Sequence, residues 1–225
     1  MTVVGSLNLR IVRTPSARKG VVLSTPQTGE KIVELDTTQP VWGRCFTVAP
    51  LVLIGTRDED RSLDLAPKHM VSPMGWQNYF GFICSPRHHT YLNIERTGEF
   101  TVSYPKPSQV LFASLAASPR PAGEPKTVLQ TFATFPASQI DGEFIEDAYL
   151  FFECRHFKTV DGFGENCLIT GEIIAAYVDK RFLRASEMDD QELIHDSPLF
   201  VYLPPGRFAS ITRSNAFPFP ADMKR

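Results

Sequence analysis

Residues 51–104 read LVLIGTRDEDRSLDLAPKHMVSPMGWQNYFGFICSPRHHTYLNIERTGEFTVSY, and the fold prediction rests on this stretch. It opens with an apolar run at 51–54 that ends in a charged turn at 57–61. Short apolar runs between turn residues are typical of buried strands. A second extended segment follows at 62–72, and a third predicted strand occupies 79–84. The stretch therefore predicts three strands in succession.

The third predicted strand leads into a polar sequence that is suited to binding an anion. Residues 85–90 read SPRHHT, and a short helical pattern follows at 90–96 and stops at Thr97 and Gly98. The first turn of a helix leaves backbone N–H groups unpaired and carries partial positive charge. A strand that brings polar side chains to such a turn predicts an anion site, whose candidate side chains are Ser85, Arg87, His88, His89 and Thr90.

Arg87 is the best charged candidate, because a guanidinium binds phosphate through a planar fork of donors. The alternative for Arg87 is an ordinary surface salt bridge. We expect only one of the neighbouring His88 and His89 to touch the anion, and the other to be a residue of the helix start.

The order of these elements resembles that of the flavin reductase-like FMN-binding split barrels. The resemblance rests on a strand, an acidic turn, a segment ending in Ala66-Pro67, a polar loop, then Thr90, Asn93 and TGEF at 97–100. A second similar block lies at 146–179, with FEC at 152–154 and ITGEI at 169–173. The two blocks cover somewhat less than half of the chain, and their order and spacing carry the match.

The resemblance implies an all-β fold with a few short helices: a split β-barrel of Greek-key type that binds FMN without a covalent bond. It also implies a homodimer with two cofactor sites near the subunit boundary. The expected activity is NAD(P)H-dependent reduction of a flavin or a small substrate by hydride transfer through FMN. The alternatives are a flavin-dependent oxidase or oxygenase that uses dioxygen, and a non-enzymatic FMN-binding electron carrier.

The resemblance also suggests which residues hold the cofactor. The candidate anion site would bind the phosphate, and the backbone of 66–72 would contact the polar edge of the flavin. Pro67 fixes its own φ and biases Ala66 toward extended geometry, which presents nearby backbone groups to a ligand. The expected contacts outside the anion site are Ala66, Pro67, Lys68, Met70, Val71, Ser72, Cys84 and Asn93. No catalytic residue is predicted, because in a flavoenzyme the cofactor carries the difficult chemistry.

The chain departs from the family pattern at two places. Many members have asparagine where this chain has Asp64, and an ionised carboxylate accepts hydrogen bonds but donates none. Reductases of the family often carry a histidine on a strand where this chain offers Asn166 or Cys167. The second departure bears on the nicotinamide site more than on the FMN site.

Composition narrows the class of protein. A chain of 225 residues with 43% hydrophobic residues is long enough for one substantial core. A net charge of −2 disfavours nucleic-acid binding, which usually requires a basic face. The sequence contains no apolar run of membrane-spanning length and no signal-peptide core, so neither a membrane nor a secreted protein is expected. Four cysteines without paired or zinc-type spacing predict free thiols in a reducing cytoplasm.

Other chemistries have weaker support. The sequence lacks the Gly-x-Ser-x-Gly elbow of the hydrolases. Cys84 lies near two histidines in sequence, but a catalytic thiol needs an oriented base, and a buried strand-end thiol is the more common role. A metal site is not expected, since neither HExxH nor Cys/His spacing occurs and adjacent histidine side chains diverge. The acidic residues 58–60 are interpreted as a solvated turn.

The whole chain is interpreted as one barrel domain, 1–225, with an N-terminal arm of about 1–45 and a C-terminal extension of about 199–225. Further strands are expected at 7–12, 20–24, 31–35, 148–159, 167–178 and from 199, and a helix at 108–117 with Ser108 as its N-cap. The strand from 199 should break at Pro204-Pro205. Phe217 and Phe219 would be exposed on a monomer, so we expect the C-terminal segment to cross a dimer boundary.

Overall fold

The computed structural model describes residues 22–24, 31–119, 126–184 and 189–220. The chain divides into two compact units, Met1–Cys45 and Phe46–Arg225. In the first unit, the strands β1 (Val22–Ser24) and β2 (Lys31–Val33) lie within the predicted segments and pair antiparallel, and the 3₁₀ turn η1 spans Val41–Gly43. The strand predicted at 7–12 lies outside the described residues. The assignment of one barrel domain with an arm stays a prediction.

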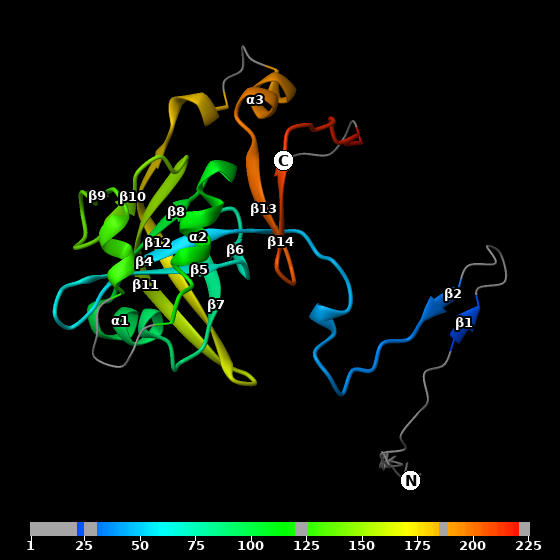
Figure 1. Ribbon diagram of the computed structural model, residues 1–225, viewed down its shortest axis with the longest axis horizontal. Coiled ribbons are helices and arrows are strands. Elements are labelled where there is room, and N and C mark those ends of the chain that lie inside the picture. Colours follow the sequence, from blue (N-terminus) through cyan, green and yellow to red (C-terminus); the bar gives the residue numbers. More distant parts are fainter. Residues whose placement is uncertain (1–21, 25–30, 120–125, 185–188, 221–225) are drawn as a thin grey trace, which may run out of the picture. The chain divides into compact units, whose positions relative to one another are not determined.

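The second unit is built on a seven-stranded antiparallel sheet (Figure 1). Its strands, in chain order, are β4 (Val52–Arg57), β5 (Leu63–Lys68), β6 (Val71–Pro73), β7 (Tyr79–Cys84), β8 (Glu99–Tyr104), β11 (Leu150–Phe163) and β12 (Asn166–Val178). Across the sheet the order is β5-β4-β8-β11-β12-β7-β6.

The sheet order requires the sheet to curl. β5 and β6 form its two opposite edges, yet only His69 and Met70 separate them in the chain. The three residue steps across this gap span at most about 11 Å, so the two edges must approach each other. The Ile83 N–H, which donates to the Met70 carbonyl oxygen at 2.9 Å, fixes the corner. The result is a split barrel, which confirms the predicted fold class. The extended segment predicted at 62–72 is accordingly two strands with a corner between them.

Alternation along the strands forms the barrel core. Phe80 and Phe82 lie two residues apart on β7, so they point to the same side of the strand, and both are almost fully buried. They pack with Ile54, Val102 and Ile169 from three other strands. Burial of a side chain of this size contributes about 1.5–3 kcal/mol relative to its exposure. This shared interior holds the first and second sequence blocks together.

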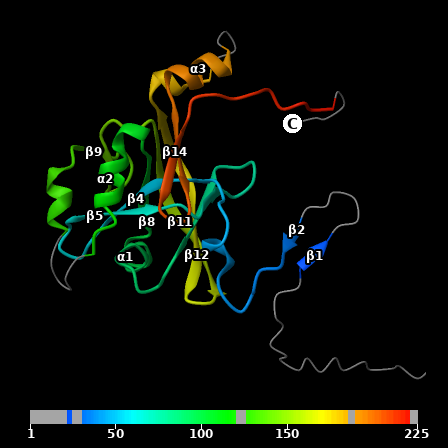
Figure 2. The ribbon, with the colours of Figure 1, turned by 45° about the vertical axis from the view of Figure 1, so that its right-hand side comes forward.

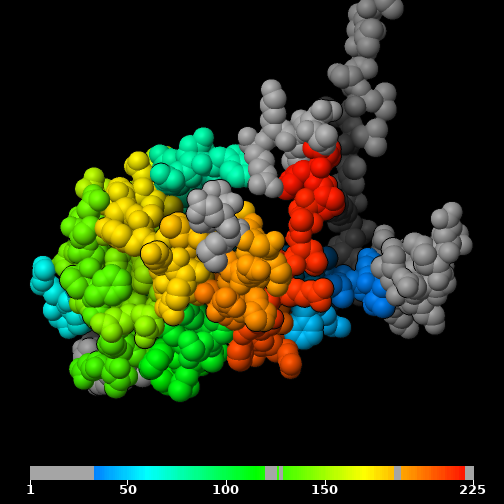
Figure 3. Space-filling view, turned by 90° about the horizontal axis from the view of Figure 1, so that it is seen from above, coloured from blue at the N-terminus to red at the C-terminus, as the bar shows by residue number. Residues whose placement is uncertain are grey.

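Smaller elements surround the barrel. A three-stranded sheet has the order β14 (Arg207–Ile211), β13 (Leu199–Leu203), β3 (Ala49–Pro50), and β9 (Thr134–Pro136) pairs with β10 (Glu143–Ile145). The helices are α1 (His89–Thr97), α2 (Val110–Leu115) and α3 (Asp190–Asp196), with 3₁₀ turns η2 (Pro107–Gln109), η3 (Thr127–Thr131) and η4 (Lys180–Phe182). Figures 1 and 2 place α1 and α3 at opposite ends of the barrel. In Figure 3 the orange residues of α3 and β13 lie beside the green segment that contains η2, which β13 contacts.

Helix α1 begins and ends close to the predicted positions. Its last turn closes on Gly98, which has a φ of 72° and donates its N–H to the carbonyl of Ile94 at 2.8 Å. A left-handed glycine is a common helix stop. Thr90, Asn93 and Ile94 form the buried face, at the i, i+3, i+4 spacing of an amphipathic helix. The start of α1 is therefore held rigidly against the barrel.

Two local predictions were wrong. Ser108 is not an N-cap, because a 3₁₀ turn precedes α2 and places Gln109 at the cap position without a side-chain cap. Gln109 instead accepts from the Lys106 N–H and donates to the Glu146 carbonyl, and these two bonds fix the turn. The connection predicted at 160–166 is also shorter. Strand β11 continues to Phe163, because register shifts and a positive φ at Gly162 absorb the extra residues.

Candidate functional site

The end of β5 and the start of α1 enclose a cavity of about 470 Å³. Its lining includes seven of the thirteen residues predicted to bind a cofactor: Ala66, Pro67, Lys68, Arg87, His88, His89 and Thr90. The structure thus brings two separately predicted segments, the 66–68 backbone and the 87–90 turn, to one place. The remaining walls are Asp64 and, from another part of the chain, Ala116, Ala117, Ser118, Pro119 and Lys126.

The other six predicted residues lie outside this lining: Met70, Val71, Ser72, Cys84, Ser85 and Asn93. Ser85 accepts a hydrogen bond from the Arg87 N–H at 3.3 Å and so shapes the turn that enters α1. Asn93 is buried and donates to Thr56 Oγ1 at 3.1 Å and to Asp58 Oδ1 at 2.9 Å. These contacts make Ser85 and Asn93 supports of the turn and the helix.

Three other members of this group lie on β6 or at its start. Val71 packs against the barrel core, and the Ser72 hydroxyl donates to the Pro73 carbonyl at 2.8 Å. Met70 is exposed, and its carbonyl accepts from Ile83. Their contacts with a flavin remain a prediction.

Lys68 has an unusual set of neighbours. Its ammonium lies 3.4 Å from Cys84 Sγ and 3.5 Å from His88 Nδ1. No carboxylate of the described residues lies within ion-pair distance of it. A cation among neutral groups at the wall of a cavity attracts an anion, since the charge is not already compensated.

The protonation state of His88 also fits an anion-binding site. Burial lowers its pKa, and the charges of Lys68 and Lys126 lower it further, while Asp64 acts in the opposite direction. His88 is therefore mainly neutral at pH 7 and can donate from one ring nitrogen while it accepts at the other. Burial also raises the pKa of the Cys84 thiol, against the influence of Lys68, so Cys84 is a protonated thiol rather than a reactive thiolate.

Lys126 is a site residue that the sequence reasoning missed. Its ammonium lies 3.2 Å from Asp64 Oδ1 and donates to the carbonyls of Leu65 at 2.9 Å and Ala116 at 3.0 Å. These contacts tie the wall at 116–119 to β5. No local pattern marks Lys126, which follows a proline- and glycine-containing stretch and becomes recognisable only when Asp64 is seen to be buried.

Asp64 itself is 2% exposed. Besides Lys126 it meets the Thr90 hydroxyl, which donates to its Oδ2 at 3.5 Å. The carboxylate therefore connects β5, α1 and the 116–126 segment. Where many family members have an asparagine donor, this chain has a buried carboxylate paired with a lysine.

Arg87 lies at the rim of the cavity. Its guanidinium is 79% exposed and sits 3.6 Å from the equally exposed Glu165 carboxylate. Exposed pairs of this kind are strongly screened and contribute about 0–1 kcal/mol. Arg87 thus makes the surface pair with Glu165, and its role as an anion contact stays a prediction.

The described residues contain no group of three or more His, Cys, Asp or Glu side chains placed to hold a metal ion. Within the same ranges, no helix has the length and apolarity needed to cross a bilayer. All four cysteines are free, with Cys45 exposed and the other three buried.

The fold is a split barrel, and comparison with known proteins identifies the family. The sequence model described as "Flavin reductase like domain" matches residues 44–197, and the chain belongs to this family.

Solved structures of the family share the fold. The 2-nitrobenzoate 2-nitroreductase NbaA of Pseudomonas fluorescens has a TM-score of 0.68 and 20% identity, over 85% of this chain and 95% of NbaA. A Shewanella frigidimarina protein, described as a flavin reductase with a split barrel domain, has a TM-score of 0.67 and 19% identity, over 77% and 87%. Flavoredoxin of Desulfovibrio vulgaris has a TM-score of 0.67 and 21% identity, over 81% and 98%.

Proposed function

We propose that this protein is an FMN-dependent oxidoreductase that takes hydride from NAD(P)H and passes electrons to a flavin or a small substrate. The observation that carries the proposal is the joint lining of one cavity by the 66–68 backbone and the 87–90 turn. FMN has a polar ring edge and a phosphate, and this cavity offers a strand edge and an anion-binding turn to match them.

The phosphate would be held by Lys68, His88 and Thr90, with Arg87 at the rim. Lys68 supplies a positive charge without a carboxylate partner among the described residues. His88 supplies a neutral ring donor, and the first turn of α1 supplies backbone N–H groups. This set favours a dianion over a neutral ligand end.

The ring edge would lie along β5. Because β5 is an edge strand that pairs only with β4, alternate backbone groups on its outer side are not used by the sheet. One of them, the Leu65 carbonyl, already accepts from Lys126. The wall at 116–119 would exclude water from the adjoining face. Bound FMN supplies the two-electron chemistry; the chain binds and orients it.

The same cavity suits FMN better than FAD, because the buried Asp64–Lys126 pair holds the 116–119 wall close to the phosphate position. An adenine-bearing flavin would need to pass this wall. We also propose a homodimer, because Phe217 and Phe219 are exposed at 71% and 41% and a second subunit would remove this apolar surface from water. We propose a location in the cytoplasm because all four cysteines are free thiols.

Two measurements test the function. Chromatography of the pigment released from purified protein should show FMN, and protein that cannot be reconstituted with FMN contradicts the proposal. Anaerobic mixing with NADH or NADPH should bleach the bound flavin, and steady-state oxidation with added flavin should follow. Bleaching by dithionite but by neither nicotinamide would instead identify an electron carrier, and rapid peroxide formation without an added acceptor would identify an oxidase.

A further inference from the structure

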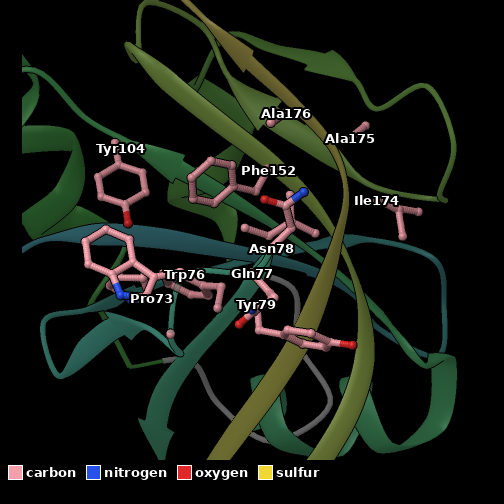
Figure 4. A pocket seen from close by; sticks show the side chains of 13 residues that line it. Pro73, Trp76, Gln77, Asn78, Tyr79, Tyr104, Phe152, Ile174, Ala175 and Ala176 are labelled. Carbon is pink, nitrogen blue, oxygen red and sulfur yellow. The ribbon is translucent and has the colours of Figure 1, made fainter. Parts of the chain in front are cut away.

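A second cavity, of about 540 Å³, opens at the mouth of the barrel (Figure 4). It lies between the loop that joins β6 to β7 and the strands β8, β11 and β12. Its lining residues are Pro73, Gly75, Trp76, Gln77, Asn78, Tyr79, Phe80, Tyr104, Phe152, Ile173, Ile174, Ala175 and Ala176. It shares no lining residue with the cavity beside α1.

The two cavities are also well separated. Phe80 lines the second cavity near the start of β7, whereas the first cavity lies beyond Cys84 at the end of that strand. Four residues of extended strand correspond to roughly 13 Å. The second cavity is therefore a distinct site, and ligand binding there does not depend on the proposed function.

The lining contains no Asp, Glu, Lys, Arg or His. Its walls are mainly aromatic and aliphatic, and the rings of Tyr104 and Phe152 pack with their centroids 5.7 Å apart. A charged ligand would lose its hydration here without gaining an ion pair, which disfavours it strongly. The site selects an uncharged molecule.

Tyr104 places a hydroxyl group in this mainly apolar wall. The Tyr104 hydroxyl takes no hydrogen bond within the described residues, and Figure 4 shows it directed toward the side of the cavity where Trp76 lies. Burial first, and then the neighbouring Tyr149 and Cys154, raise the pKa of Tyr104 well above its usual value. The hydroxyl therefore keeps its proton and is available to an acceptor on a ligand.

The rim of the cavity carries an exposed tryptophan. Trp76 is 97% exposed, although the loop around it is well fixed. The Met74 N–H donates to the Tyr79 carbonyl at 2.9 Å, and Gly75 has a φ of 109°, a backbone conformation that residues with a side chain rarely adopt. The loop thus presents a large flat ring to the cavity mouth without burying it.

We propose that this cavity binds an uncharged planar aromatic molecule with a hydrogen-bond acceptor, such as a carbonyl group. The acceptor takes the proton of the Tyr104 hydroxyl in a hydrogen bond, and the ring packs on Phe152 beneath Trp76. Aromatic surface supplies the affinity, and the Tyr104 hydroxyl supplies the discrimination.

Three small probes of similar size test this by calorimetry on the full-length protein. Acetophenone is neutral and has an acceptor, ethylbenzene is neutral without one, and benzoate carries a charge. We expect acetophenone to bind more tightly than ethylbenzene and benzoate to bind at least about 10-fold more weakly than acetophenone. Binding should also change the emission of Trp76, and a Trp76→Phe variant should lose this signal, because Trp42 does not line the cavity.

The matched variants are Tyr104→Phe and Tyr91→Phe. Tyr104→Phe should weaken acetophenone by about 2- to 12-fold, the range of one neutral hydrogen bond, and leave ethylbenzene unchanged. Tyr91, which does not line the cavity, serves as the control. An unaltered thermal midpoint verifies that each variant folds.

Three outcomes would overturn the proposal. They are equal affinity for benzoate and acetophenone, an equal loss of acetophenone and ethylbenzene in Tyr104→Phe, and the absence of binding together with shielding of Trp76 from acrylamide. The last result would identify the cavity as a surface covered by another copy of the chain.

Discussion

Replacement of Lys68 by methionine tests the anion site most directly. Methionine keeps most of the apolar stem and removes the charge, so packing on β5 changes little. The hydrogen-bond partners of the ammonium among the described residues are Cys84 Sγ at 3.4 Å and His88 Nδ1 at 3.5 Å, and neither is charged in the resting protein. A phosphate would therefore be its first ionic partner.

The expected magnitude follows from that geometry. A hydrogen bond to a charged group contributes about 1.5–3 kcal/mol. Lys68→Met should then weaken FMN by about 10- to 150-fold. Arg87→Ala would weaken FMN over the same range if its guanidinium bound phosphate bidentately. Because Arg87 is 79% exposed and already faces Glu165, we expect a loss of only about 0–1 kcal/mol, or up to about 5-fold.

The assay is parallel titration with FMN and riboflavin, which differ only by the phosphate. A phosphate contact predicts that Lys68→Met affects FMN alone. Lys158→Met, on the exposed part of β11, is the control for a change of net charge. Equal losses of FMN and riboflavin, or a larger effect of Arg87→Ala than of Lys68→Met, would refute the reasoning. Failure of the parent protein to bind any flavin would instead contradict the proposed function.

Three further predictions concern buried carboxylates and assembly. Lys126→Met should lower the free energy of unfolding by about 3–5 kcal/mol, because it leaves Asp64 buried without its cation, and the double variant Asp64→Asn/Lys126→Met should recover part of it in denaturant titrations. Burial alone would raise the pKa of Glu153, but hydrogen bonds donated by Ser138, Gln139 and Tyr177 bring this pKa below its usual value. The free energy of unfolding should therefore fall as the pH drops through the lowered pKa. This fall should be absent in Glu153→Gln. Truncation after Thr212, which keeps β14 whole, should convert a sedimenting dimer to a monomer, and an unchanged dimer would contradict a role for the tail.

The barrel was predictable because its core strands carry their own pattern. Phe80 and Phe82 lie two residues apart, and this spacing alone assigns both to the core face. The corner at His69 and Met70 was not predictable, because it depends on the edges of the sheet meeting and leaves no local turn residue. Ser108 was misassigned for a similar reason: Gln109 bonds to Glu146, a residue far away in the chain, and that contact selects the 3₁₀ turn.

In the candidate site, too, the features with a local cause were predictable from the sequence, and those that depend on distant residues were not. The strand β7 ends at Cys84 and the helix α1 starts at His89, so they are adjacent in sequence and their meeting requires no tertiary information. The role of Lys68 does require it, because its chemistry follows from the neutral state of Cys84 and His88 and from the lack of an ion pair with any described carboxylate. Asp64 was the residue in the sequence that pointed to a missing partner. A carboxylate in place of a donor, on a strand with buried neighbours, must find a cation somewhere, and Lys126 arrives from a loop that no periodicity describes. A buried acidic residue is thus a reason to search the loops for its partner, because the free energy of an unpaired charge makes that partner part of the same site.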